Sequence, residues 1–370
     1  MTIPARSLLL IVLVASVGCT DTTPPPAERH DAPVVADQAK PAEEAKPKPD
    51  VTAATKLGPA LEAPAAVKAA PAAVADLSGE NPVLVELVEK GIQMPDGTVI
   101  KLPAPTLGNG MDAAAQKAAI KKIMPRNCTY EDFTDTSTQA PFGLKIKTPP
   151  SRNDKYTIRT VDLGFVVHGK WDVLTSDKFA DGFTKPNTKA NTKNQGGALK
   201  KSGFLSKEEM AKRSLQSLTK NGQEDRYFFS TFSLFDMVEV SATRYAVLSK
   251  TPNAIALAAR LDPRFVDDPE YPNQWQPIDK DALGNPVLGK KQPYSGAGFY
   301  LKITRLSEPA GAIFFEFHSA FNEPQGWFDG QPTLRQKLPT IAKFQVEQFR
   351  GKLARASMKQ EEEGEKKAEK

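Results

Sequence analysis

Aromatic residues are confined to one stretch of this chain. All 19 Phe, 7 Tyr and 3 Trp lie between Tyr130 and Phe349. Aromatic side chains supply much of the apolar area that a protein core buries, so residues outside this stretch can build little core of their own. A chain of 370 residues has room for more than one domain. The aromatic distribution instead predicts a single globular part, at about residues 81–357.

The first residues have the pattern of an export signal. Met1–Gly18 contains a charged Arg6, an apolar run at Ser7–Val14 and small residues before Cys19. The run Ser-Val-Gly-Cys that ends at Cys19 resembles the lipobox of bacterial lipoproteins, although that motif prefers an aliphatic residue where this chain has Ser16. The resemblance implies a signal peptide at 1–18 and an exported protein of the bacterial cell envelope. It would be anchored to a membrane through lipidated Cys19, in the outer membrane or facing the periplasm. The alternative is ordinary signal cleavage nearby, with Cys19 left as a bystander.

Composition divides the rest of the chain into four parts. Residues 19–80 are rich in Ala and Pro and lack aromatics, which predicts a disordered tether. Residues 81–129 carry only aliphatic apolar side chains, and we expect a small helical and extended subregion that packs on the main domain. Residues 130–357 are predicted to form that domain, and residues 358–370 a charged tail. Helices are predicted in the N-terminal subregion at Asn81–Lys90 and Met111–Met124.

Alternating apolar and polar residues predict strands through most of the main domain. Gly298–Leu306 alternates in this way, and Tyr156–Leu174 is the clearest long strand. Arg226–Leu248 is also rich in strand-forming residues, whereas Asp262–Asp281 has the prolines and acids of a long loop. With helices gathered near both ends, this order predicts the α+β class, with a curved meander of about five to seven antiparallel strands.

The C-terminal part combines a two-faced strand with a long helix. The strand is predicted at Ala312–Phe321. One of its faces carries Ile313, Phe315, Phe317 and Phe321, and the other carries Phe314, Glu316 and His318. The helix is predicted at Pro339–Ala356, because a proline is tolerated at a first helical position. Its apolar stripe consists of Ile341, Ala342, Val346, Phe349, Leu353 and Ala356. Such a helix can lie across the sheet that precedes it.

This order resembles the C-terminal end of START-type lipid-transfer domains, which have the helix-grip fold. The resemblance rests on strand, turn and strand, then Glu-Pro-Gln-Gly-Trp-Phe at 323–328, Leu-Arg-Gln-Lys-Leu-Pro at 334–339 and a long helix. It covers residues 226–356 in pattern and 311–350 in actual residues. It implies an antiparallel sheet that curls around the helix and holds an apolar or amphipathic, lipid-like ligand between them.

Carried onto this chain, the resemblance implies particular ligand-binding residues. Trp327, Ile341, Phe349 and Leu353 would lie on the cavity side. The face that holds Phe314, Glu316 and His318 would be either the cavity lining or the exposed back of the sheet. An apolar cavity with a few polar groups is the usual form of a ligand site. The alternative is that the apolar stripe packs into a filled core with no ligand.

Glu316 and His318 are the strongest candidates for chemistry. They are two apart on one strand and therefore share a face, as an acid–base pair or two metal ligands would. No third ligand stands at a recognisable spacing, and the alternative is a satisfied, partly buried polar pair. The sequence has no Gly-x-Ser-x-Gly elbow, P-loop or dinucleotide fingerprint. We therefore assign no catalytic residue, metal or cofactor, and nothing argues positively for an enzyme.

Charge gives little indication of a partner. The net charge of +5 is small for this length, and no basic stripe interleaved with aromatics predicts nucleic-acid binding. A lysine-rich stretch at Thr184–Gln195 is either a solvated loop or a contact for an anionic surface.

Two main hypotheses result. The first is a membrane-tethered envelope lipoprotein that binds an apolar or amphipathic ligand. The second is a structural or protein-interaction lipoprotein with a filled core, whose protein partner the sequence does not identify. A third is an enzyme that uses Glu316 and His318.

Overall fold

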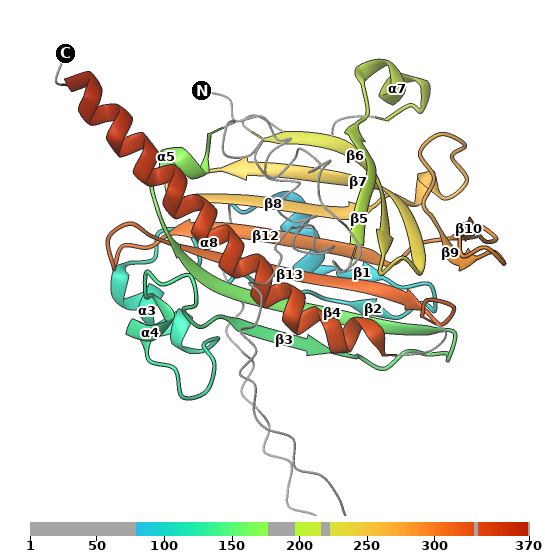
Figure 1. The fold of residues 1–370 in the computed structure, drawn as a ribbon, viewed down its shortest axis with the longest axis horizontal. Coiled ribbons are helices and arrows are strands. Elements are labelled where there is room, and N and C mark those ends of the chain that lie inside the picture. Colours follow the sequence, from blue (N-terminus) through green and yellow to red (C-terminus); the bar gives the residue numbers. More distant parts are fainter. Residues whose placement is uncertain (1–78, 177–196, 216–222, 329–331, 369–370) are drawn as a thin grey trace, which may run out of the picture. The chain divides into compact units, whose positions relative to one another are not determined.

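One large antiparallel sheet organises the fold (Figure 1). The computed structural model describes residues 79–176, 197–215, 223–328 and 332–368, all within one compact unit. The strands of this sheet are β3 (Gly143–Lys147), β4 (Tyr156–His168), β5 (Gly197–Phe204), β6 (Glu224–Leu234), β7 (Val238–Lys250), β8 (Ala254–Leu261), β9 (Gln274–Lys280), β10 (Pro286–Leu288), β11 (Gln292–Pro293), β12 (Ala297–Arg305) and β13 (Ala312–Pro324). The predicted α+β class, with an antiparallel sheet and a C-terminal helix, is confirmed.

The sheet has more strands than the sequence predicts. Its main order is β5-β6-β7-β8-β12-β13-β4-β3, and β7 pairs with β9 over its first residues and with β8 over its later ones. The eleven strands exceed the predicted five to seven. One error lies in Asp262–Asp281, whose prolines and acids indicated a loop, and β5, β10 and β11 also lie where no strand was predicted. Pairing with Val238–Ser241, a contact that is distant in sequence, makes β9 a strand there.

The strand predicted at Tyr156–Leu174 is too long. β4 ends at His168, and a short helix, α5 (Trp171–Leu174), follows. Gly169 marks the end of the strand because the C-terminal helix passes directly over it. A Cβ at Gly169 would lie 2.6 Å from Cγ of Leu353, so only glycine permits this approach.

The C-terminal helix, α8 (Thr333–Ala368), extends beyond both predicted ends. It begins before Pro339, because Leu334 and Leu338 are buried and their packing stabilises the turn that precedes the proline. At its other end the helix continues through 358–368, where the sequence predicts a charged tail.

The middle of α8 packs on one face of the sheet. Val346, Phe349 and Leu353 belong to the same buried cluster as Phe165 and Phe315 of the sheet, as the predicted stripe requires. Polar bonds add to this packing. The guanidinium of Arg350 donates to the carbonyl oxygens of Val166, Thr138, Ala140 and Pro141. Arg350 therefore joins the helix to β4 and to the segment before β3.

The N-terminal segment covers the opposite face of the sheet. Its elements are α2 (Pro82–Glu89), β1 (Ile92–Gln93), β2 (Val99–Ile100), α3 (Ala113–Lys121) and α4 (Tyr130–Phe133). Asn81 caps α2, and its side-chain amide also donates to the carbonyl oxygens of Val247 and Ala256. Leu84 and Leu87 are fully buried against this face. Aliphatic side chains of α2 and aromatic side chains of α4, Tyr130 and Phe133, therefore cover this face together.

The remaining helices are short. α7 (Lys207–Lys212) begins with a capping box formed by Ser206 and Glu209, and a 3₁₀ turn forms at Pro263–Phe265. No helix within the described ranges has the length and apolar character that a bilayer span requires. The predicted signal peptide, Cys19, the predicted tether up to residue 78 and Thr184–Gln195 lie outside the described residues. Glu80, the last residue of the predicted tether, is buried and forms an ion pair with Lys302.

Candidate functional site

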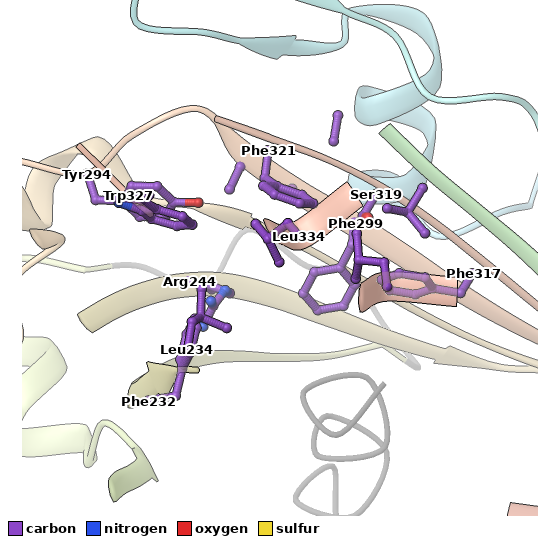
Figure 2. Close-up of a pocket in the computed structure, with 15 residues that line it drawn as sticks. Phe232, Leu234, Arg244, Tyr294, Phe299, Phe317, Ser319, Phe321, Trp327 and Leu334 are labelled. Atoms are coloured by element: carbon purple, nitrogen blue, oxygen red, sulfur yellow. The ribbon is translucent and has the colours of Figure 1, made fainter. Parts of the chain in front are cut away.

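A cavity of about 110 Å³ lies between the first turns of α8 and the sheet (Figure 2). The sheet contributes side chains from β4, β6, β7, β12 and β13, on the face that also carries α8. Aromatic and aliphatic groups make up most of the lining, among them Phe232, Phe299, Phe317, Phe321, Trp327 and Leu338. The cavity is thus an apolar space at the N-terminal end of the helix.

Trp327 forms much of the wall between the sheet and α8. The ring of Trp327 stacks on that of Tyr294 with centroids 5.5 Å apart, and it meets the ring of Trp275 edge-on at 6.3 Å. Phe328, with φ of 67°, is also buried beside it. The turn after β13 therefore places the side chains of Trp327 and Phe328 in the interior. The residues before them in the sequence do not indicate this burial.

Arg244 is the only charged residue among the described residues that line the cavity. Its Nη1 donates to Oγ of Ser230 at 2.9 Å, and within the described chain no carboxylate forms an ion pair with it. Burial lowers the pKa of Arg244 to about 10, and the nearby phenol of Tyr294 acts in the opposite direction. The guanidinium therefore remains charged at neutral pH.

Two further polar groups belong to the same wall. Nε1 of Trp327 is buried and has no hydrogen-bond partner in the described part of the chain. The hydroxyl of Tyr294 has a raised pKa, because burial disfavours its charged form. Figure 2 shows Arg244 and the Trp327–Tyr294 pair toward one end of the cavity and Phe299 and Phe317 toward the other. The cavity accordingly has a hydrogen-bond-donating end and an apolar end.

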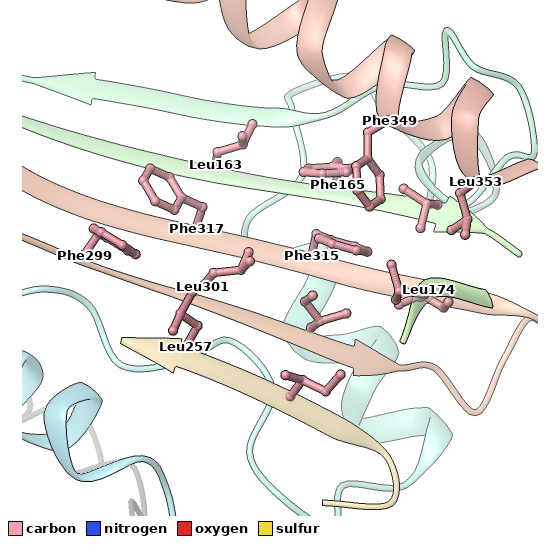
Figure 3. Packing of buried hydrophobic residues seen from close by; sticks show 14 of the residues in the cluster. Leu163, Phe165, Leu174, Leu257, Phe299, Leu301, Phe315, Phe317, Phe349 and Leu353 are labelled. Atoms are coloured by element: carbon pink, nitrogen blue, oxygen red, sulfur yellow. The ribbon is translucent and has the colours of Figure 1, made fainter. Parts of the chain in front are cut away.

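The middle of the interface between α8 and the sheet is filled (Figure 3). The ring centroid of Phe349 lies 4.8 Å from that of Phe315 and 6.3 Å from that of Phe165. Leu353 is fully buried in the same cluster. The helix therefore contacts packed side chains around Phe349 and Leu353, and the cavity lies nearer its beginning, beside Leu334 and Leu338.

The residues predicted to bind ligand fall into three groups. Trp327 lines the cavity. Phe349 and Leu353 lie in the filled core, and Ile341 is half-buried and belongs to neither the cavity lining nor the core cluster. Phe314, Glu316 and His318 lie on the other face of the sheet. That face is neither cavity lining nor exposed, because the N-terminal segment covers it.

Glu316 and His318 do share a face, and they form a buried polar cluster there. Nδ1 of His318 lies 2.8 Å from Oδ1 of Asp162, and its Nε2 lies 3.5 Å from Oε2 of Glu316. That same Glu316 oxygen accepts a bond from the backbone N–H of Thr106 at 2.7 Å. The ring of Tyr300 packs on His318 with centroids 4.9 Å apart.

This cluster raises the basicity of its histidine. Burial disfavours the charged imidazolium, but the hydrogen bond to Asp162 and the adjacent carboxylate of Glu316 outweigh it and raise the pKa of His318 to about 9. A protonated imidazole between two carboxylates is a structural ion pair and a poor general base at neutral pH. No group of three or more His, Cys, Asp or Glu in the described ranges is arranged to hold a metal ion.

Sequence reasoning assigned no ligand-binding role to Arg244 or Tyr294. Arg244 lies in a stretch correctly predicted as strand, but its face was not assigned because aromatics occur on both sides of that stretch. Tyr294 follows a region interpreted as loop. The face on which a strand residue lies can be predicted only where apolar and polar residues alternate regularly.

Comparison with known proteins gives little further information. No protein-family model matches the sequence, and no curated protein matches it. Among solved structures the chain is similar to human STARD10, with 8% sequence identity and a TM-score of 0.28. The match covers 65% of this chain and 84% of that chain. It is a weak structural resemblance to a START domain and identifies neither a family nor a ligand.

Proposed function

We propose that this protein is a lipid-anchored protein of the bacterial envelope that binds a small amphipathic ligand beside the first turns of α8. The observation that carries the proposal is an apolar cavity whose described lining contains one guanidinium and no carboxylate. Aromatic and aliphatic walls favour a hydrocarbon group, because its transfer from water is favourable. The half-buried guanidinium of Arg244 favours a carboxylate or phosphate, with which it can form charge-assisted hydrogen bonds.

The size of the cavity limits the ligand. At about 110 Å³ it is well below the roughly 300–1,000 Å³ of typical ligand pockets. It is closer to the roughly 150 Å³ of a cavity that holds a benzene molecule. A diacyl phospholipid would not fit. The proposed ligand is therefore a short single-chain or cyclic amphiphile with an anionic end.

Replacing Arg244 by Leu should remove the preference for an anionic ligand. We expect the protein to bind straight-chain carboxylates of about four to six carbons, which suit a cavity of this size, more tightly than the matching alcohols, by roughly 10-fold or more. In Arg244→Leu the two series should bind equally. Isothermal titration or native mass spectrometry measures the ratio, and Arg226→Leu, an exposed position on the neighbouring strand, is the matched control. A carboxylate preference that survives in Arg244→Leu contradicts the proposed role of the guanidinium.

The second candidate is an interaction lipoprotein without a ligand. The filled centre of the interface between α8 and the sheet favours it, because Phe165, Phe315 and Phe349 leave no space there. Native mass spectrometry after mild extraction separates the two candidates. A co-purifying small molecule supports ligand binding. A protein that carries no ligand and binds no member of the carboxylate series supports the second candidate.

Replacing Cys19 by Ala should release the protein from membranes. The proposal that Cys19 carries acyl chains rests on the small residues and the Cys at the end of the apolar run. Two acyl chains hold a protein firmly because each buried methylene contributes about 0.8 kcal/mol. Fractionation of cells should move Cys19→Ala from the membrane pellet to the soluble fraction, with Cys128→Ala as the control. Equal membrane retention of Cys19→Ala and the parent would rule out this anchor.

A further inference from the structure

An exposed apolar surface lies on a hairpin near the cavity. It consists of Leu283 in the β9–β10 turn, Val287 and Leu288 in β10, and Met237 in the β6–β7 turn, and we call it the hairpin surface. Their exposed fractions are 87%, 47%, 48% and 36%. They are four of the seven large apolar side chains that the described residues expose. Such a concentration at one place is unusual for a surface that meets only water.

The hairpin surface is held in a defined shape. Asp281 Oδ1 accepts bonds from the backbone N–H groups of Leu283 and Asn285, at 2.9 and 2.8 Å, so the turn presents Leu283 outward. The backbone N–H of Ile278 donates to the carbonyl oxygen of Met237 at 2.7 Å. Leu288 pairs with Ile278 across the hairpin. These bonds hold the backbone of the hairpin and of the adjacent β6–β7 turn in place.

Three lysines lie along the hairpin. Lys280 closes β9, and Lys290 and Lys291 follow β10; all three are exposed, and within the described chain none forms an ion pair. Two acids are close by in sequence, Asp279 and Asp281, and the hydrogen bonds of Asn285 and the turn to Asp281 lower its pKa. Three lysines against two aspartates leave the hairpin with a small net positive charge beside its aliphatic tip. Apolar side chains next to cationic ones are also what interfacial amphipathic helices place in the headgroup region of a bilayer.

The hairpin is continuous with the cavity wall. Trp275 lies in β9 and contacts Trp327. At the other end of the hairpin, β11 connects Lys290 and Lys291 to Tyr294. Figure 1 shows β9 and β10 projecting from the end of the sheet at which α8 begins. A partner that binds the hairpin would therefore lie beside the cavity.

We propose that the β9–β10 hairpin docks this protein on an anionic bilayer, with its aliphatic tip in the headgroup region and its lysines at the phosphates. Each lysine near an anionic surface adds attraction, which salt screens. Addition of a partner strand is the poorer explanation, because β10 has three residues and begins with Pro286, which has no backbone N–H. The docking proposal depends only on the hairpin. That a ligand passes from the bilayer to the cavity would follow only if the proposed function also holds.

Vesicle co-sedimentation tests the docking. The full chain carrying Cys19→Ser, which removes any acyl anchor, is mixed with vesicles of phosphatidylcholine alone or with 30% phosphatidylglycerol. We expect at least 10-fold stronger partition to the anionic vesicles at low salt. Leu283→Asp/Val287→Asp should lower this partition at least fivefold, and Lys290→Glu/Lys291→Glu should abolish the dependence on phosphatidylglycerol. Val99→Asp, exposed on β2 away from the hairpin, is the matched control and should bind like the parent.

Two results would overturn the proposal. One is equal partition of the parent and Leu283→Asp/Val287→Asp. The other is a parent dimer that this double variant converts to monomer, without any vesicle binding, since the surface would then join two copies of the chain. The carboxylate titration distinguishes this failure from failure of the proposed function. Hairpin variants should keep the affinity for the carboxylate, whereas Arg244→Leu should keep vesicle binding.

Discussion

Replacing Lys302 by Met should lower the free energy of unfolding by about 3–5 kcal/mol. The ammonium of Lys302 in β12 forms an ion pair with the carboxylate of Glu80, and their side chains are only 1% and 4% exposed. Removal of the lysine leaves a buried carboxylate without its counter-charge, which costs far more than the loss of an exposed pair. The expected drop in melting temperature is roughly 10 °C for a domain of this size.

A double-mutant cycle isolates the pair. Glu80→Met alone should be similarly destabilising, because it leaves the ammonium buried. The double variant Lys302→Met/Glu80→Met should recover most of the loss, since apolar groups of similar volume can replace a buried ion pair. Lys117→Met, which removes an exposed pair with Glu131, is the control and should cost about 1 kcal/mol or less. Additive losses in the double variant would show that the two side chains are not coupled.

Stability should fall as pH rises from about 6.5 to about 9, through the titration of His318. The pKa of His318 is raised in the folded protein from 6.5 to about 9. The folded state therefore binds the proton more tightly than the unfolded state, and this contribution is fully present below pH 6.5. It is lost as pH rises through 9, and its full size is up to about 3 kcal/mol.

His318→Gln separates this titration from others. Asp162, Glu316 and Tyr300 face the imidazole, and Lys147 lies 3.9 Å from Asp162. Burial raises the pKa of Tyr300 well above its ordinary value, so that phenol does not titrate in this range. Urea unfolding at several pH values should show a decline for the parent that His318→Gln lacks. The same decline in both proteins would assign it to another group.

The C-terminal strands and helix were predictable from sequence because their patterns are regular. Phe315 and Phe317 alternate with Glu316 and His318, and a period of two specifies opposite faces without any knowledge of the partners. The apolar stripe of α8 is similarly local, which is why Val346 and its neighbours were assigned to the face that packs on the sheet.

What covers each face was not predictable in the same way. Thr106 reaches Glu316 across 210 positions of sequence, and Glu80 reaches Lys302 across 222. No local pattern encodes contacts of that range. The cavity was equally hard to predict. Arg244 and Trp327 line it from segments distant in sequence, and Trp275, which packs on Trp327, lies in β9, within a segment rich in prolines and acids.

Pro339 divides α8 into a first section that lines the cavity and a second section that packs in the core. A proline has no N–H to donate to the carbonyl four residues earlier, so the ladder of helical bonds is interrupted there. Leu334 and Leu338, which line the cavity, precede the break, and Val346 to Leu353, which fill the core, follow it. The cooperative unit that holds the helix in place therefore does not need the turns that enclose the cavity. Substitutions at Leu334 or Leu338 can change the shape of the cavity while the rest of the helix remains packed on the sheet.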